Sequence, residues 1–130
     1  MMKVLVLSNA EFKKQEIDNT LEELQKIVGG YIEYPYLSKR FNDNEIDIVI
    51  NEEGKFINGL RPEIAIVNKV TEQILDVVYG SCVFVSHDED GNTIELNEEQ
   101  TQIVMEELQM EAVLTYKETG KDVITKVLFV

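Results

Sequence analysis

The chain has 130 residues, of which 12 are Lys or Arg and 25 are Asp or Glu, so its formal net charge at pH 7 is −13. A negative charge of this size argues against direct, sequence-independent nucleic-acid binding and against docking on an anionic membrane, because both need a positive surface. The length and the 44% share of hydrophobic residues predict a single globular domain over residues 1–130.

The N-terminal third predicts two strands and a helix. Residues 3–7 form a short apolar run that is typical of a buried strand, and residues 12–17 form a more polar strand. Thr20 and Glu23 have the spacing of a capping box, in which a side-chain oxygen accepts a hydrogen bond from an otherwise unpaired amide of the first turn. Gly29 can adopt the left-handed conformation that ends a helix, so we expect the helix to lie between Thr20 and Gly29.

The middle of the chain predicts short strands separated by turns. Pro35 places one of these strands at a sheet edge or at a bend, because proline cannot donate a ladder hydrogen bond. Apolar residues between 63 and 79 have helical spacing, although many are β-branched, and we expect a helix over residues 70–77. The other expected elements are a strand at 31–37, a polar loop at 38–44, and strands at 46–50 and 55–58 joined by an acidic turn.

The C-terminal third predicts a hairpin, a helix and a second hairpin. Asn97 is a favourable cap for a helix from Glu98 to Met110. Strands interrupted by two or three helices, with turns of hairpin length, indicate an α+β fold in which the helices pack on a mainly antiparallel β-sheet. The expected strands lie at 81–85 and 93–95, and at 112–116 and 123–130 around a turn at Glu118-Thr119-Gly120-Lys121.

The cysteine content and the start of the chain predict a cytoplasmic protein. Cys82 is the only cysteine, so no intramolecular disulfide forms, as is typical of a reducing compartment. The apolar run at residues 3–7 is too short for a signal peptide, and no apolar stretch approaches the length of a membrane span.

One acidic segment has part of the spacing of a calcium-binding loop. Asp88, Asp90, Asn92 and Glu99 occupy positions 1, 3, 5 and 12 of such a loop, which supply oxygen ligands. The sixth position requires glycine, and Thr93 stands there instead. Because Asp-Gly is also a strong turn signal, a hairpin turn is the favoured interpretation, and we expect no metal site.

No other pattern predicts catalysis. Cys82 and His87 could form a nucleophile and base only if the fold brought them together, and on one strand they would point to opposite faces. One cysteine and one histidine cannot complete a tetrahedral metal site, and no glycine-rich phosphate loop occurs. The acids between residues 45 and 53 could form an acid–base pair only if one were buried. We therefore expect no enzymatic activity and no cofactor, with an enzyme acting on a small substrate as an alternative.

Arg40 and Arg61 are the only arginines, and both lie in segments expected to be irregular. Arg40 precedes Phe41, and an arginine fork beside an aromatic ring can hold a phosphate and a base. The alternative is that both are ordinary surface residues.

Three motifs carry a resemblance to a known family. They are LQKIVGGYIE at 24–33, NEEGK at 51–55 and GLRP at 59–62. In this order and spacing they resemble a family of small domains of unknown function that are encoded by phages and plasmids. Family members often carry Asn and Arg after the proline, where this chain has Glu63 and Ile64. If those polar residues serve a ligand, other residues must bind it here.

The resemblance, together with the absence of a catalytic motif, implies a phage-type binding protein acting in host takeover or against host defence. We expect it to sequester a small nucleotide-like ligand or a host protein. The alternative is an acidic inhibitor that mimics nucleic acid through segments 43–53 and 88–99. A homodimer could form through an edge strand near Pro35 or the apolar strand at 127–130, and core packing is the alternative explanation of both segments. The expected ligand-binding residues are Arg40, Phe41, Asn51, Lys55 and Arg61.

Overall fold

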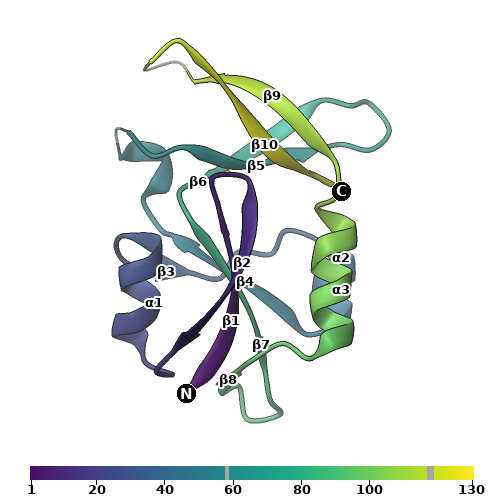
Figure 1. Ribbon diagram of the computed structural model, residues 1–130. Helices are drawn as coiled ribbons and strands as arrows, with labels where there is room; N and C mark the ends of the chain where they lie inside the picture. Colours follow the sequence, from purple (N-terminus) through teal and green to yellow (C-terminus); the bar gives the residue numbers. More distant parts are fainter. Residues whose placement is uncertain (58, 117–118) are drawn as a thin grey trace.

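The computed structural model describes residues 1–57, 59–116 and 119–130, and within them the strands form two sheets (Figure 1). Neighbouring strands are antiparallel except for β5 and β10, which are parallel. The expected α+β fold with mainly antiparallel pairing is therefore confirmed. The large sheet has the order β2 (Glu11–Ile17), β1 (Met2–Ser8), β7 (Cys82–His87), β4 (Ile46–Asn51), β3 (Ile32–Glu33), with β8 (Thr93–Ile94) also paired to β7. The small sheet has the order β6 (Ile74–Tyr79), β5 (Pro62–Val67), β10 (Lys121–Phe129), β9 (Glu111–Tyr116).

The main hydrophobic core lies between the two sheets. Alternation along β1 directs Leu5 and Leu7 into this core, with Phe84 of β7 and Leu128 of β10, and directs Val4 to the opposite face. Helices α2 (Lys39–Asp43) and α3 (Glu98–Glu107) contribute to the same core. Helix α1 (Leu21–Val28) covers the other face of the large sheet (Figure 1). Within the described ranges, no helix is both long and apolar enough to span a membrane.

Helices α1 and α3 begin at their predicted caps, and α1 also ends as its sequence predicts. The Thr20 hydroxyl accepts a hydrogen bond from the Glu23 amide at 3.3 Å, and Gly29 ends α1 with a φ of 83°. The Glu23 carboxylate forms an ion pair with Lys26. Asn97 and Gln100 form a reciprocal capping box at α3, which ends at Glu107 rather than at the expected Met110.

The helix expected over residues 70–77 is wrong, because β5 and β6 form a hairpin there. The side chain of Asn68 accepts hydrogen bonds from the amides of Val70 and Thr71, and its backbone amide bonds to the Gln73 carbonyl. This turn reverses the chain inside the apolar pattern. The flanking β-branched residues then pack as strands, for which their stiff side chains are suited.

Three other predicted elements differ from those in the structure. The strand expected at 31–37 is reduced to β3, the loop at 38–44 contains α2, and the strand at 55–58 is replaced by a short 3₁₀ helix, η1 (Gly54–Phe56). Asn58 in that expected strand and Glu118 in the expected last turn lie outside the described residues. The apolar strand at 127–130 is no edge, because β10 lies between β5 and β9, with Val127 and Leu128 buried.

A buried carboxylate links the two sheets. Glu63, on β5 of the small sheet, is 2% exposed and accepts hydrogen bonds at 2.9 Å from the amides of Asn9 and Ala10 in the β1–β2 turn. Arg61 donates to the same carboxylate at 2.9 Å and to the backbone carbonyl of Ile124 in β10. Burial raises the pKa of Glu63, against the lowering effect of these donors.

The segments at 24–33 and 51–55 meet at one junction. Asn51, 4% exposed at the end of β4, donates from its side chain to the Val28 carbonyl at 3.1 Å and accepts from the Glu53 amide at 2.8 Å. A Cβ on Gly30 would lie 3.0 Å from the Asn51 amide nitrogen, and one on Gly54 would lie 2.7 Å from the backbone oxygen of Tyr79. These close approaches explain both glycines by packing, and the junction positions η1.

Replacing Asn51 with alanine should destabilise the fold by about 2–3 kcal/mol, because two hydrogen bonds of a buried amide are lost and their partners remain. Chemical denaturation measures this change. Asn19→Ala is the control, since the exposed Asn19 makes a single hydrogen bond to the Thr93 carbonyl and should lose less than about 0.5 kcal/mol. Equal losses in the two variants would contradict the role of the junction.

Candidate functional site

The five expected ligand-binding residues do not form one cluster. Asn51 and Lys55 line one groove beside η1, whereas Arg40 lines another beside α2. Arg61 is engaged with Glu63 and Ile124, so its replacement by alanine would leave a buried carboxylate without its cation and would not test ligand binding alone.

Phe41 is not placed to stack on a base. Its ring is 3% exposed and lies edge-on to Phe84 in the main core, with 6.1 Å between ring centroids. Helix α2 turns the adjacent Arg40 to the surface, where its guanidinium bonds to Glu107 at 2.8 Å and to Glu106 at 3.1 Å. The expected combination of these two neighbours as one binding unit is therefore wrong.

The structure instead surrounds Arg40 with other basic and aromatic residues. A groove of about 570 Å³, the α2 groove, is lined by Tyr36, Lys39, Arg40, Lys69 and Phe129, among others. Tyr36 is 67% exposed and Phe129 is 40% exposed. These residues come from α2 and the segment before it, from the β5–β6 turn and from the end of β10. Nothing in their sequence spacing indicates that they meet, since the hairpin turn at Asn68 brings Lys69 to this place.

The charge of the α2 groove differs from that of the whole chain. Its lining contains three basic side chains and two acidic ones, Asp43 and Glu107, whereas the chain has 12 basic and 25 acidic residues. Lys39 is paired with Asp43 at 2.6 Å. Lys39 and Arg40 are paired with acids, including Glu106 beside the groove, so the groove is close to neutral and less acidic than the chain as a whole.

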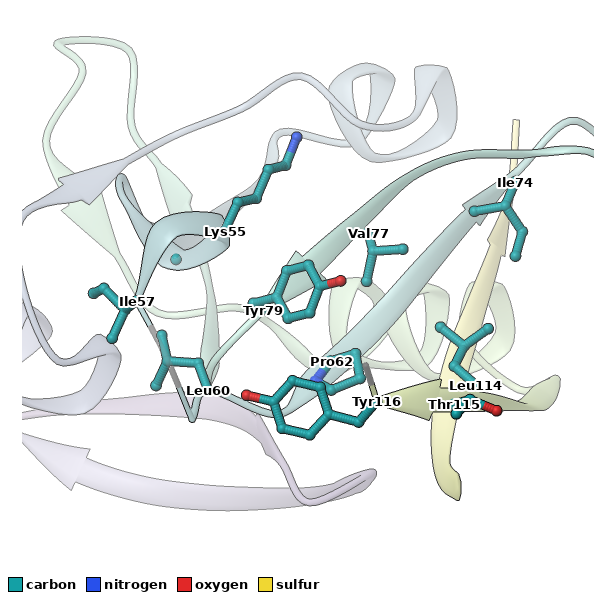
Figure 2. Close-up of a pocket in the computed structure, with 11 residues that line it drawn as sticks. Lys55, Ile57, Leu60, Pro62, Ile74, Val77, Tyr79, Leu114, Thr115 and Tyr116 are labelled. Carbon is teal, nitrogen blue, oxygen red and sulfur yellow. The ribbon is translucent and has the colours of Figure 1, made fainter. Parts of the chain in front are cut away.

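A second groove, the sheet groove, lies against the small sheet (Figure 2). It has a volume of about 500 Å³, and Figure 2 shows the rings of Tyr79 and Tyr116 on either side of Pro62. Leu60 and Leu114 add apolar walls. Sequence reasoning missed this groove, because its tyrosines lie on strands far apart in the chain.

Lys55 borders the sheet groove and a smaller one, the η1 groove, of about 240 Å³. Its ammonium group forms an ion pair with Asp76 of β6 at 2.6 Å. The two grooves share Gly54, Lys55, Val77 and Tyr79, so they adjoin along η1 and β6.

The two acidic segments meet at one end of the molecule. His87, at the end of β7, bonds to Asp47 at 2.8 Å, and the Gln100 side chain, in the first turn of α3, donates to the Asn44 carbonyl at 2.9 Å. We call this region the acidic end. It contains Glu45, Asp47, Asp88, Glu98 and Glu99. Glu52 and Glu53 lie at the other end of β4, roughly 20 Å away for a six-residue strand.

The segment with partial calcium-loop spacing begins with the favoured hairpin turn, which joins β7 and β8. The Asp88 carboxylate accepts hydrogen bonds from the amides of Asp90 and Asn92. The hydrogen bonds from Asn92 are the main cause of the lowered pKa of Asp88. Within the described part of the chain, no group of three or more His, Cys, Asp or Glu side chains is placed to hold a metal ion. Cys82 is fully buried in the main core, and burial raises the pKa of its thiol.

The pKa of His87 should lie above its ordinary value of about 6.5, because the hydrogen bond to Asp47 stabilises the imidazolium. Its stabilising contribution is therefore present at low pH and is lost as the pH rises through this raised pKa. Since His87 is the only histidine, one NMR titration measures its pKa directly. Asp47→Asn should shift the pKa downward, whereas an unchanged value would contradict the assigned pair.

Comparison with known proteins identifies a family but no characterised relative. No curated protein and no solved structure matches this chain. The matching family profile covers residues 2–109, which include every motif of the expected resemblance and end after α3, before β9 and β10. The chain belongs to this family, which is described as a domain of unknown function (DUF3846).

Proposed function

We propose that the protein is a non-enzymatic binding protein that sequesters a small nucleotide-like ligand in the α2 groove. The observation that carries this proposal is the meeting of Lys39, Arg40 and Lys69 around one groove in a chain of charge −13. Its volume of about 570 Å³ lies within the range of small-molecule sites.

The ion pairs of Arg40 are suited to replacement by a phosphate. The Arg40 side chain is 45% exposed, and surface ion pairs of this kind contribute little to stability. The two acids hold the guanidinium in place, and a phosphate can accept its two N–H groups as a bidentate partner. Lys69, from the β5–β6 turn, would face the same phosphate.

The aromatic side chains of the groove supply the second half of the recognition. Tyr36 and Phe129 are exposed, which leaves their ring faces available. Stacking of a base on an aromatic ring contributes about 1–3 kcal/mol and tolerates different bases. A nucleotide would therefore bind through its phosphate to the cations and through its base to a ring.

A second candidate function is an acidic inhibitor that mimics nucleic acid and blocks a basic host enzyme. The convergence of two acidic segments at the acidic end favours it, since Glu45, Asp47, Asp88 and the first turn of α3 form one negative surface. Such a surface attracts a basic partner over long distances.

The family resemblance supports a biological setting for either activity. Small domains of phages and plasmids that lack catalytic motifs suit host takeover or evasion of host defence, within the cytoplasm of the host cell. In that setting the protein would act by lowering the free concentration of its ligand or partner.

The first experiment is native mass spectrometry of the gently purified protein, repeated after denaturation. A small mass that is released on unfolding would support the proposal and identify the ligand class. Titration with a panel of nucleoside mono-, di- and triphosphates and cyclic nucleotides then follows. If no mass is released and no nucleotide of this panel binds saturably, the result counts against the nucleotide proposal.

Arg40→Ala and Lys69→Ala should each weaken binding of the identified nucleotide about tenfold or more, because a charge-assisted hydrogen bond contributes about 1.5–3 kcal/mol. Isothermal titration calorimetry measures the change. Lys13→Ala on β2 is the control, because it removes the same charge from an exposed position on another sheet edge. If Lys13→Ala weakened binding as much as Lys69→Ala, the groove would not be the site.

For the second candidate, the association rate with a basic nucleic-acid-binding enzyme should fall steeply as salt is raised from about 50 to 500 mM. The double variant Glu98→Gln/Glu99→Gln should lower that rate at low salt. Stopped-flow fluorescence measures both effects. A rate that is independent of salt would reject nucleic-acid mimicry at the acidic end.

A further inference from the structure

The η1 groove and the sheet groove form one continuous surface with two kinds of lining. They share Lys55 and Tyr79, which are both labelled in Figure 2, so a ligand can occupy both grooves. The η1 groove has three carboxylates, Glu33, Glu52 and Asp76, around an apolar floor that includes Ile50. The sheet groove is mainly apolar and aromatic.

The charge of the η1 groove selects the class of ligand. Lys55 is its one basic lining residue, and the ion pair with Asp76 at 2.6 Å already neutralises it. Glu33 and Glu52 are exposed on opposite strands, β3 and the end of β4. An anion would be repelled here, whereas a cationic group would gain two carboxylate partners.

The exposed aromatic ring at this groove indicates a protein partner. Phe56 is 83% exposed on η1, and Ile57 and Ile74 of the adjoining sheet groove are 38% and 48% exposed. Single exposed apolar residues are ordinary on a protein surface. These three differ because they are grouped along two adjoining grooves. Aromatic residues beside a pocket are the usual anchors of protein interfaces.

The size of the two grooves also fits a peptide segment. The η1 groove, at about 240 Å³, has room for one long side chain, and the sheet groove, at about 500 Å³, has room for several. An arginine side chain has an apolar stem that suits Ile50 and a guanidinium that can bind carboxylates and stack on the Phe56 ring.

We infer that this surface is a docking site for a basic protein partner, which places an arginine in the η1 groove and neighbouring apolar side chains in the sheet groove. The carboxylates of the η1 groove indicate a basic partner. The exposed Phe56 indicates that this partner is a protein and not a small cation. Among the described lining residues, the site meets the α2 groove only at Leu37, and it shares no charged or aromatic residue with that groove or with the acidic end. The nucleotide and inhibitor proposals can therefore fail without affecting it.

The test uses the full chain and a short synthetic peptide with two leucines followed by two arginines, titrated by fluorescence anisotropy. Phe56→Ala should weaken binding about tenfold, as loss of an interface anchor does. Val70→Ala is the matched control, because Val70 is also 83% exposed but lies in the β5–β6 turn. Its binding should stay within about twofold of the original. Both side chains are exposed, so thermal unfolding should confirm intact folds.

A second pair of variants separates specific binding from general attraction to an acidic protein. Glu33→Gln/Glu52→Gln and Glu98→Gln/Glu99→Gln remove the same charge, and only the first pair should weaken the peptide about tenfold. Equal weakening by both pairs, an unchanged affinity in Phe56→Ala, or no saturable binding at all would overturn the inference. Weakening by the second pair alone would move the basic partner to the acidic end.

Discussion

Glu63 holds the two sheets in their relative position, and the grooves depend on that position. Its carboxylate receives two amides from the β1–β2 turn and one guanidinium N–H from Arg61, which also reaches β10. Asn9 and Ala10 in that turn have φ angles of 55° and 60°, which are unfavourable for a residue with a side chain. The hydrogen bonds to Glu63 offset this strain and satisfy a carboxylate that burial would otherwise make very unfavourable. Ile64, the next residue, is fully buried in the core, so residues 63 and 64 both have structural roles.

An acidic chain uses its few cations within its own fold, and this shapes where ligands can bind. Arg61 forms an ion pair with Glu63, Lys55 with Asp76, and Arg40 with Glu106 at the end of α3. The exposed pairs can open at little cost, whereas the pair at Glu63 cannot. Ligand binding elsewhere on the surface therefore depends on two kinds of site. One is a group of carboxylates that has no cation beside it, and the other is a group of cations that lies beside aromatic rings.

Local signals predicted much of the fold. The cap at Thr20, the left-handed Gly29 and the capping box at Asn97 act within one turn of chain, so their residues alone identify α1 and α3. The apolar run of β1 likewise identified a buried strand. Between residues 63 and 79 the apolar spacing fitted a helix as well as a hairpin, and the turn at Asn68 decided between them.

The candidate site was less predictable, because it depends on tertiary contacts. Phe41 and Arg40 are adjacent in sequence, yet α2 sends one side chain into the core and the other to the surface. Lys69 and Phe129 join Arg40 only because the β5–β6 turn and the end of β10 lie beside α2. Asn51 and Gly30, which lie far apart in the sequence, pack against each other at a structural junction that sequence spacing alone does not reveal.

The position of β10 in the small sheet also has a consequence for how the chain folds during synthesis. Strands of the large sheet all precede residue 95, so that sheet can assemble on the ribosome while the rest of the chain is still being made. The β5–β6 hairpin can form early, but the small sheet must wait for β10, which pairs Lys126 with Ile64 across nearly half the chain. Until then one edge of β5 lacks its partner strand, and an unpaired apolar edge of this kind is prone to aggregation.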